Sequence, residues 1–100
     1  MGVATSVETI GLSDNRVRLF PNPITSNQSL FFSLEGSFLQ KETANLQLIN
    51  ALGQTILSKE ITLLGTAQTL SIPLPQQIAG LHLISLKTDN FSVVRSFIVE

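Results

Sequence analysis

Side chains that could carry acid–base chemistry are few in this 100-residue chain. His82 is the single histidine, and the seven carboxylic acids are scattered from Glu8 to Glu100. A hydrolase triad requires a nucleophile, a base and a group that orients the base. On a strand, His82 would share one face with Ile84 and Leu86. We therefore expect it to point toward the core and to bond to backbone rather than to act as a catalytic base.

Metal and cofactor chemistry finds equally little support. The chain has no cysteine, which excludes disulfides, thiolate metal sites and cysteine nucleophiles. A lone histidine does not build a typical zinc site, and the acids lack the Asp/Asn/Gly ladder of a calcium loop. Gly53, Gly65 and Gly80 are isolated glycines without the pattern of a phosphate-binding loop. We therefore expect no enzyme activity, no metal and no cofactor.

Charge and composition weigh against further classes. The net charge is −1 and the six Lys and Arg residues are scattered, so we expect no nucleic-acid binding. The lack of Trp and Tyr weighs against a sugar-stacking surface, and we expect Phe31, Phe32 and Phe38 to pack in the core. The stretch from Ile61 to Leu86 carries no charged residue, but glycines and prolines interrupt it. We expect no membrane-spanning segment.

The elements that must hold these residues are strands. From Val17 onward, short runs rich in Leu, Ile, Val, Phe and Thr alternate with turn residues, which is typical of an all-β sandwich or barrel. No window has a convincing helical period, and low contrast between strand faces favours two packed sheets. We predict an all-β, seven-stranded antiparallel immunoglobulin-like β-sandwich. The expected strands are Val17–Phe20, Ser29–Leu34, Asn45–Asn50, Gln54–Glu60, Gln68–Ile72, Leu81–Thr88 and Phe91–Val99.

Polar segments frame these strands. We expect residues 1–16 to be a linker or tail, in which Met1 and Gly2 are an added start, and residues 17–100 to be one domain. The expected connections are a loop at Gly36–Thr43, turns at Ala51–Gly53 and Asp89–Asn90, and an undecided segment at 61–66.

The triplet Pro21-Asn22-Pro23 directly follows the first expected strand. Its two prolines fix φ at two positions and remove two backbone donors. They also favour extended geometry at Phe20 and Asn22, the residues that precede them. We expect this triplet to end the strand and to direct the chain across to the next one.

Four motifs occur in a characteristic order. They are Pro21-Asn22-Pro23, Asn50-Ala51-Leu52-Gly53-Gln54-Thr55, Leu74–Ile84 around Gly80, and Val94-Arg95-Ser96-Phe97-Ile98-Val99. Each motif is weak alone. In this order and spacing, the chain from Val17 to Glu100 resembles the type A C-terminal sorting domain of the type IX secretion system of Bacteroidetes-type bacteria.

The resemblance implies a protein-sorting function without catalysis. Such domains end secreted proteins that reach the periplasm by a signal peptide, and the outer-membrane translocon then recognises the folded domain. A sortase-like peptidase usually cuts the linker before the domain, and the cargo is released or attached at the cell surface. Here the cut would fall within or upstream of Val3–Asn15, and the signal peptide would belong to a longer parent.

The resemblance also marks candidate recognition residues. These are Pro21, Asn22, Pro23, Gly53, Gln54, Gly80, His82, Arg95, Phe97, Ile98 and Val99. The chain departs from the family at two of them, because His82 stands where an aromatic residue, often Tyr, is usual and Arg95 where Lys is common. A sheet edge or terminal strand offers unpaired backbone groups to a partner, so we expect Arg95–Glu100 and the proline triplet to matter most.

Two other functions stay open on the residues alone. A structural, adhesion or carbohydrate-binding module would need an exposed aromatic patch or a metal loop. A small hydrolase or isomerase would need His82 exposed beside a carboxylate. The oligomeric state also stays open, including a homodimer through an exposed sheet edge.

Overall fold

The computed structural model describes residues 8–11, 15–25, 28–37, 39–74 and 79–100. Within these residues the chain forms strands and turns, without a helix. The strands are β1 (Glu8–Ile10), β2 (Val17–Phe20), β3 (Ser29–Leu34), β4 (Lys41–Asn50), β5 (Thr55–Leu64), β6 (Gln68–Pro73), β7 (Gly80–Lys87) and β8 (Phe91–Val99). All seven expected strands are present, and β1 is an addition to them.

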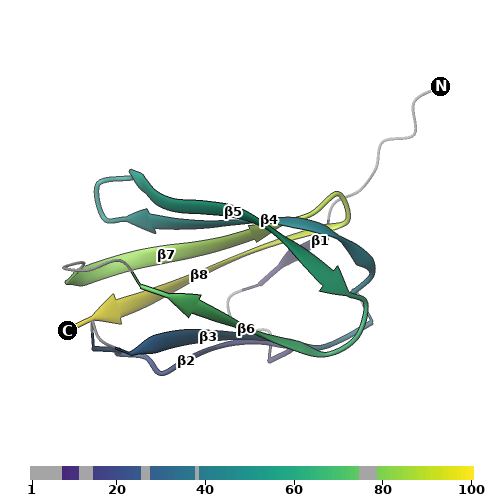
Figure 1. Ribbon diagram of the computed structural model, residues 1–100, viewed down its shortest axis with the longest axis horizontal. Helices are drawn as coiled ribbons and strands as arrows, with labels where there is room; N and C mark the ends of the chain where they lie inside the picture. Colours follow the sequence, from purple (N-terminus) through teal and green to yellow (C-terminus); the bar gives the residue numbers. More distant parts are fainter. Residues whose placement is uncertain (1–7, 12–14, 26–27, 38, 75–78) are drawn as a thin grey trace.

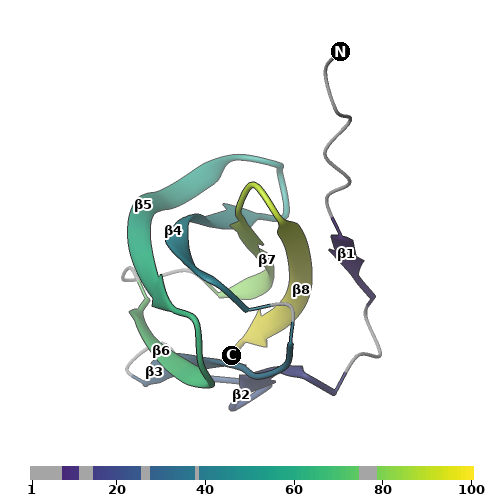
Figure 2. The same cartoon turned by 90° about the vertical axis from the view of Figure 1, so that its right-hand side faces the viewer.

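Two sheets make up the molecule (Figures 1 and 2). The larger sheet has the strand order β1-β8-β7-β4-β5, and the smaller has the order β2-β3-β6. Neighbouring strands are antiparallel, apart from β1, which runs parallel to β8. The core contains Phe32, Phe91, Phe97, Ile24, Leu30, Leu34, Leu46, Leu48, Leu63, Ile72, Ile84 and Leu86, which are all fully buried. The predicted all-β sandwich is therefore confirmed.

Alternation along the central strands explains why they lie between core and solvent. Successive side chains on a strand point to opposite faces of the sheet. In β8 the odd-numbered residues from Phe91 to Val99 are buried, while the even-numbered ones are half-buried or exposed. In β7, His82 follows the same rule and lies on the buried face with Ile84 and Leu86.

The hairpin of β4 and β5 is longer than the sequence predicted. β4 begins at Lys41, inside the segment expected to be a loop, and β5 continues to Leu64. The additional residues pair with one another, Lys41 with Leu64 and Glu42 with Leu63. The start of β4 is polar and shows no apolar alternation, which is why a loop was expected there. The undecided segment 61–66 is strand as far as Leu64.

β1 was not expected, because three residues within a polar segment carry too little periodicity to indicate a strand. It pairs in parallel with the first residues of β8, Glu8 with Phe91 and Ile10 with Val93. Ile10 is only 3% exposed and belongs to the hydrophobic core. The segment expected to be a linker therefore contributes one strand and one core side chain.

The turn at Asp89–Asn90 joins β7 to β8 as predicted. The backbone N–H of Thr88 donates to the carbonyl of Phe91 at 2.8 Å, which closes the hairpin. The Thr88 hydroxyl accepts from the N–H groups of Asn90 and Phe91 at 2.9 and 3.0 Å. Across the described part of the chain, no helix is long and apolar enough to cross a membrane.

Candidate recognition site at the end of the last strand

The proline triplet holds the end of β8, although the two segments are far apart in sequence. The side-chain Oδ1 of Asn22 accepts a hydrogen bond from the backbone N–H of Ile98 at 3.1 Å. Ile24 donates its N–H to the Ile98 carbonyl at 2.9 Å and accepts from the N–H of Glu100 at 2.8 Å. The triplet thus ends β2, and Asn22 within it and Ile24 after it provide hydrogen-bond partners for the edge of β8.

Ile24 anchors this contact in the core. Its side chain is fully buried, and its backbone forms an isolated parallel bridge with Val99. The peptide bonds that precede Pro21 and Pro23 are both cis. Pro23 and Asn22 are themselves exposed, so the outer side of the triplet faces solvent.

The start of β7 lies on the other side of the same end. Gly80 is opposite Val99, and Leu81 is opposite Ile98. Leu81 and Ile98 point outward and are 51% and 50% exposed. Directly opposite side chains on antiparallel strands are close neighbours. The two therefore form one small apolar surface beside the end of β8.

His82 lies under this surface, on the core side of the sheet. It is opposite Phe97, and the two rings stack with centroids 5.6 Å apart and planes 27° apart. Its Nδ1 lies 3.0 Å from the carbonyl oxygen of Gly80. His82 is 3% exposed, which confirms the expected core histidine with a backbone hydrogen bond. The hydrolase alternative required an exposed histidine beside a carboxylate, and this arrangement does not meet that requirement.

The turn between β4 and β5 reaches the same end of the sandwich (Figure 1). Asn50 organises it, because its Oδ1 accepts from the N–H groups of Leu52 and Gln54 at 3.0 Å each. Its Nδ2 also donates to Oε1 of Gln54 at 2.9 Å. Gly53 has φ near +84°, which L side chains rarely adopt, and a Cβ there would meet no atom within 4 Å. The backbone conformation, not lack of space, requires glycine at this position.

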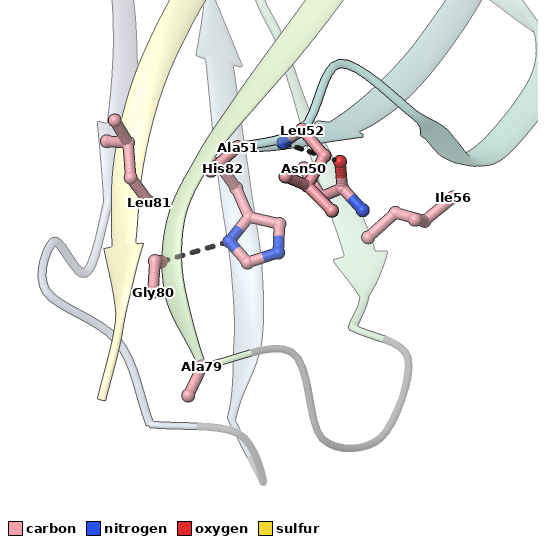
Figure 3. A pocket seen from close by; sticks show the side chains of 8 residues that line it. All are labelled: Asn50, Ala51, Leu52, Ile56, Ala79, Gly80, Leu81 and His82. Carbon is pink, nitrogen blue, oxygen red and sulfur yellow. Dashed lines mark hydrogen bonds between the residues drawn. The ribbon is translucent and has the colours of Figure 1, made fainter.

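A pocket of about 280 Å³ opens between this turn and the start of β7 (Figure 3). It is lined by Asn50, Ala51, Leu52, Ile56, Ala79, Gly80, Leu81 and His82. His82 is opposite Asn50 in the register of β7 and β4, which brings the two motifs together. Through this pocket, the turn motif and the Gly80 motif become neighbours in space.

Arg95 is placed differently from the other candidates. It is opposite Ile84, farther from the chain end, and it points to the buried face of β8 with 7% exposure. Its Nη1 donates to the carbonyl of Val94 at 3.1 Å. Its guanidinium is therefore almost out of reach of a partner that docks from outside.

The eleven candidate residues thus divide by exposure. Asn22, Pro23, Gly53, Gln54, Gly80 and Ile98 are exposed, and Pro21 is half-buried. His82, Arg95, Phe97 and Val99 are buried. A partner outside the folded domain can touch the first group directly, whereas the buried residues shape the strands, and of these His82 also lines the pocket described above.

Three residues of this end are not among the eleven candidates, although Asn50 and Leu81 lie within two of the four motifs. Ile24 binds the terminal strand, Asn50 shapes the turn, and Leu81 forms the apolar surface with Ile98. Asn directly before a glycine-containing turn is a usable signal, because its side chain bonds backbone groups two residues on. Nothing in the local sequence of Ile24 or Leu81 indicates their long-range partners.

The phenylalanine expectation holds in part. Phe32 is fully buried, as predicted, whereas Phe31 is half-buried and stacks on Phe20 with ring centroids 5.6 Å apart. Phe20 is 43% exposed, so this pair reaches the outer face of the smaller sheet. Phe38 lies outside the described residues.

The chemistry available at this end is hydrogen bonding and apolar contact. Among the described residues there is no group of three or more His, Cys, Asp or Glu side chains that could hold a metal ion. The exposed residues at this end include Asn22, Pro23, Leu52, Gly53, Gln54, Gly80, Leu81, Ile98 and Glu100. Such a surface can make apolar and hydrogen-bonded contacts with another protein.

Comparison with known families identifies one match. The family model described as the secretion system C-terminal sorting domain matches residues 18–100. No similar curated protein and no similar solved structure was found. The match covers most of the chain and includes all eleven candidate residues. The chain therefore belongs to the C-terminal sorting domains of the type IX secretion system, the family that directs secreted proteins to the cell surface or the extracellular space.

Proposed function

We propose that the outer-membrane translocon of the type IX system recognises this domain at the end where β8 terminates. The observation that carries the proposal is the hydrogen bond from the Ile98 N–H to Asn22, which joins the first and last family motifs. Together with the two backbone bonds of Ile24, it gives the last residues one fixed conformation. A partner can read a preorganised terminus without the entropic cost of ordering it.

The surface beside this terminus supports a protein partner. The half-exposed side chains of Leu81 and Ile98 lie next to polar backbone and to the exposed amide of Asn22. An apolar centre with a polar rim is the usual composition of a protein–protein contact. The net charge of −1 offers no long-range steering, so short-range contacts would decide specificity.

The wider export route is also part of the proposal. The parent protein crosses the periplasm with this domain folded, and a sortase-like peptidase then cuts on the N-terminal side of the domain. In this scheme the chain is a signal and a substrate, and it performs no catalysis itself. The partners are the translocon and the peptidase.

The test is a reporter fusion. Residues 3–100 would be placed behind a signal peptide and a fluorescent protein, in a bacterium with an intact type IX system and in a strain that lacks it. We expect the reporter at the surface or in the medium only in the intact strain. The mass of the exported reporter would then locate the cut.

Retention of a folded fusion in the periplasm of both strains would contradict the proposal. The likeness to sorting domains would then be one of fold, and a structural or carbohydrate-binding module would become the leading alternative. The Phe20–Phe31 pair, with Phe20 43% exposed, would be the first surface to test in that case.

A further inference from the structure

The pocket between the β4–β5 turn and the start of β7 has a composition that specifies its ligand (Figure 3). Its walls are mostly the aliphatic side chains of Ala51, Leu52 and Ile56. The amide of Asn50 is engaged by bonds within the turn, to Leu52 and to Gln54. Both lone pairs of the Asn50 oxygen are used in these bonds, which leaves His82 as the side chain in the lining that can offer a new hydrogen-bond acceptor.

The hydrogen bond to Gly80 fixes the role of each ring nitrogen of His82. The Gly80 carbonyl oxygen can only accept, so Nδ1 must carry the proton of the bond at 3.0 Å. In the neutral ring, Nε2 is then an acceptor. Nε2 makes no hydrogen bond within the described part of the chain. In Figure 3 it lies on the side of the ring away from Gly80, toward Ile56.

The matching ligand must donate a hydrogen bond and be uncharged. The pocket lining contains no Asp, Glu, Lys or Arg, so a buried charge would have no counter-ion there. The ligand must also be largely apolar and of moderate size, to fill about 280 Å³. A cavity of roughly 150 Å³ already binds benzene, so an aromatic ring fits.

We propose that this pocket binds the side chain of a tyrosine from a partner protein, with the phenol hydroxyl donating to Nε2 of His82. Tyrosine joins an apolar ring to a neutral hydroxyl, which serine and threonine do not. Leu52, which is 83% exposed at the rim, would cover one flank of the ring. The pocket opens at the end of the sandwich assigned above to recognition, so the identity of the partner as export machinery rests on the proposed function.

An NMR titration of the purified chain tests the binding itself. The probes are N-acetyl-L-tyrosinamide and, as the matched ligand without a hydroxyl, N-acetyl-L-phenylalaninamide. We expect saturable shifts at Leu52, Ile56 and the His82 ring, with a dissociation constant on the order of millimolar for a ligand of this size. Loss of one hydrogen bond predicts binding of the phenylalanine probe that is roughly fivefold weaker.

The variant H82F supplies the matched control, because it keeps an aromatic ring against Phe97 and removes the acceptor. In this variant, the two probes should bind with equal affinity.

Equal binding of the two probes to the unaltered chain, or no saturable shift at the pocket, would overturn the proposal. Neither result depends on whether the variant folds. If N-acetyl-L-tryptophanamide bound more tightly than the tyrosine probe, the assignment to tyrosine would be wrong, and the indole N–H of a tryptophan would be the donor to His82. Failure of the reporter fusion to be exported would remove the proposed function, while the titration would still decide the pocket.

Discussion

At the scale of single residues, Asn22 does what its neighbours cannot. The prolines on either side have no N–H, and they set the chain direction. The amide between them supplies an acceptor that lies across the sheet edge from Ile98. Ile24 makes two further backbone hydrogen bonds, to Ile98 and Glu100, and β7 pairs with β8 as far as Val99. The Asn22 bond is therefore one of several contacts that hold the terminus. Its contribution should be measurable but not decisive for folding.

We expect N22A to lower the free energy of unfolding by about 0.5–1 kcal/mol, because the lost bond is exposed and water can replace it. Urea denaturation measures this change. The Ile98 amide should exchange its hydrogen faster in N22A, and N22D, which keeps an oxygen acceptor at the same position, should preserve both stability and protection. Unchanged exchange at Ile98 in N22A would show that the bond does not protect the terminal strand in solution.

At the scale of elements, the strands that alternate clearly were predictable and the polar ones were not. β7 and β8 follow period-two burial over most of their length, and their positions agree with the sequence within a residue or two. β1 and the first residues of β4 are mostly polar, and they form strands because they pair with neighbouring strands in the sheet. The candidate site was likewise predictable only in its local features. The sequence indicates that the prolines end β2, but their bond to Ile98 depends on how the sheets pack.

The strand β1 gives the prediction that belongs to this scale. Ile10 is 3% exposed, so I10A should remove a core contact and cost about 2 kcal/mol of unfolding free energy. I10V, which keeps most of the side chain, should cost about 1 kcal/mol or less. Chemical denaturation of both variants is the measurement. Equal stability of I10A and the parent would mean that β1 is not docked in solution, and that the stable domain begins at β2.

At the scale of the whole molecule, the terminal-strand end combines two requirements that can be separated. The domain must fold, because Phe97 and Val99 of the terminal motif are buried in its core. Its end must also present the outward residues of β8 to a partner. Deleting Phe97–Glu100 should abolish export, but it removes both properties at once. Substitutions that affect only one of them are more informative.

Ile98 and Val94 allow the surface requirement to be tested alone. Both point outward from β8, the residues being 50% and 42% exposed, and they lie about 13 Å apart along the strand. We expect I98D to reduce export of the reporter fusion strongly while the domain remains folded by circular dichroism. V94D places the same charge on the same face, away from the terminus, and should be exported normally.

The fold requirement is tested with L48A, whose parent side chain is fully buried between the sheets. Loss of this core contact should cost about 3 kcal/mol, and export should fall in step with the folded fraction and recover at lower temperature. Export of I98D should not recover at lower temperature, because this substitution changes the contact surface and not the stability of the fold.

If V94D and I98D reduced export equally, the translocon would contact the whole outer face of β8 and not only its end. If L48A were exported normally while mostly unfolded, recognition would depend on the terminal sequence alone, and the hydrogen-bonded arrangement of Asn22, Ile24 and Ile98 would serve stability only.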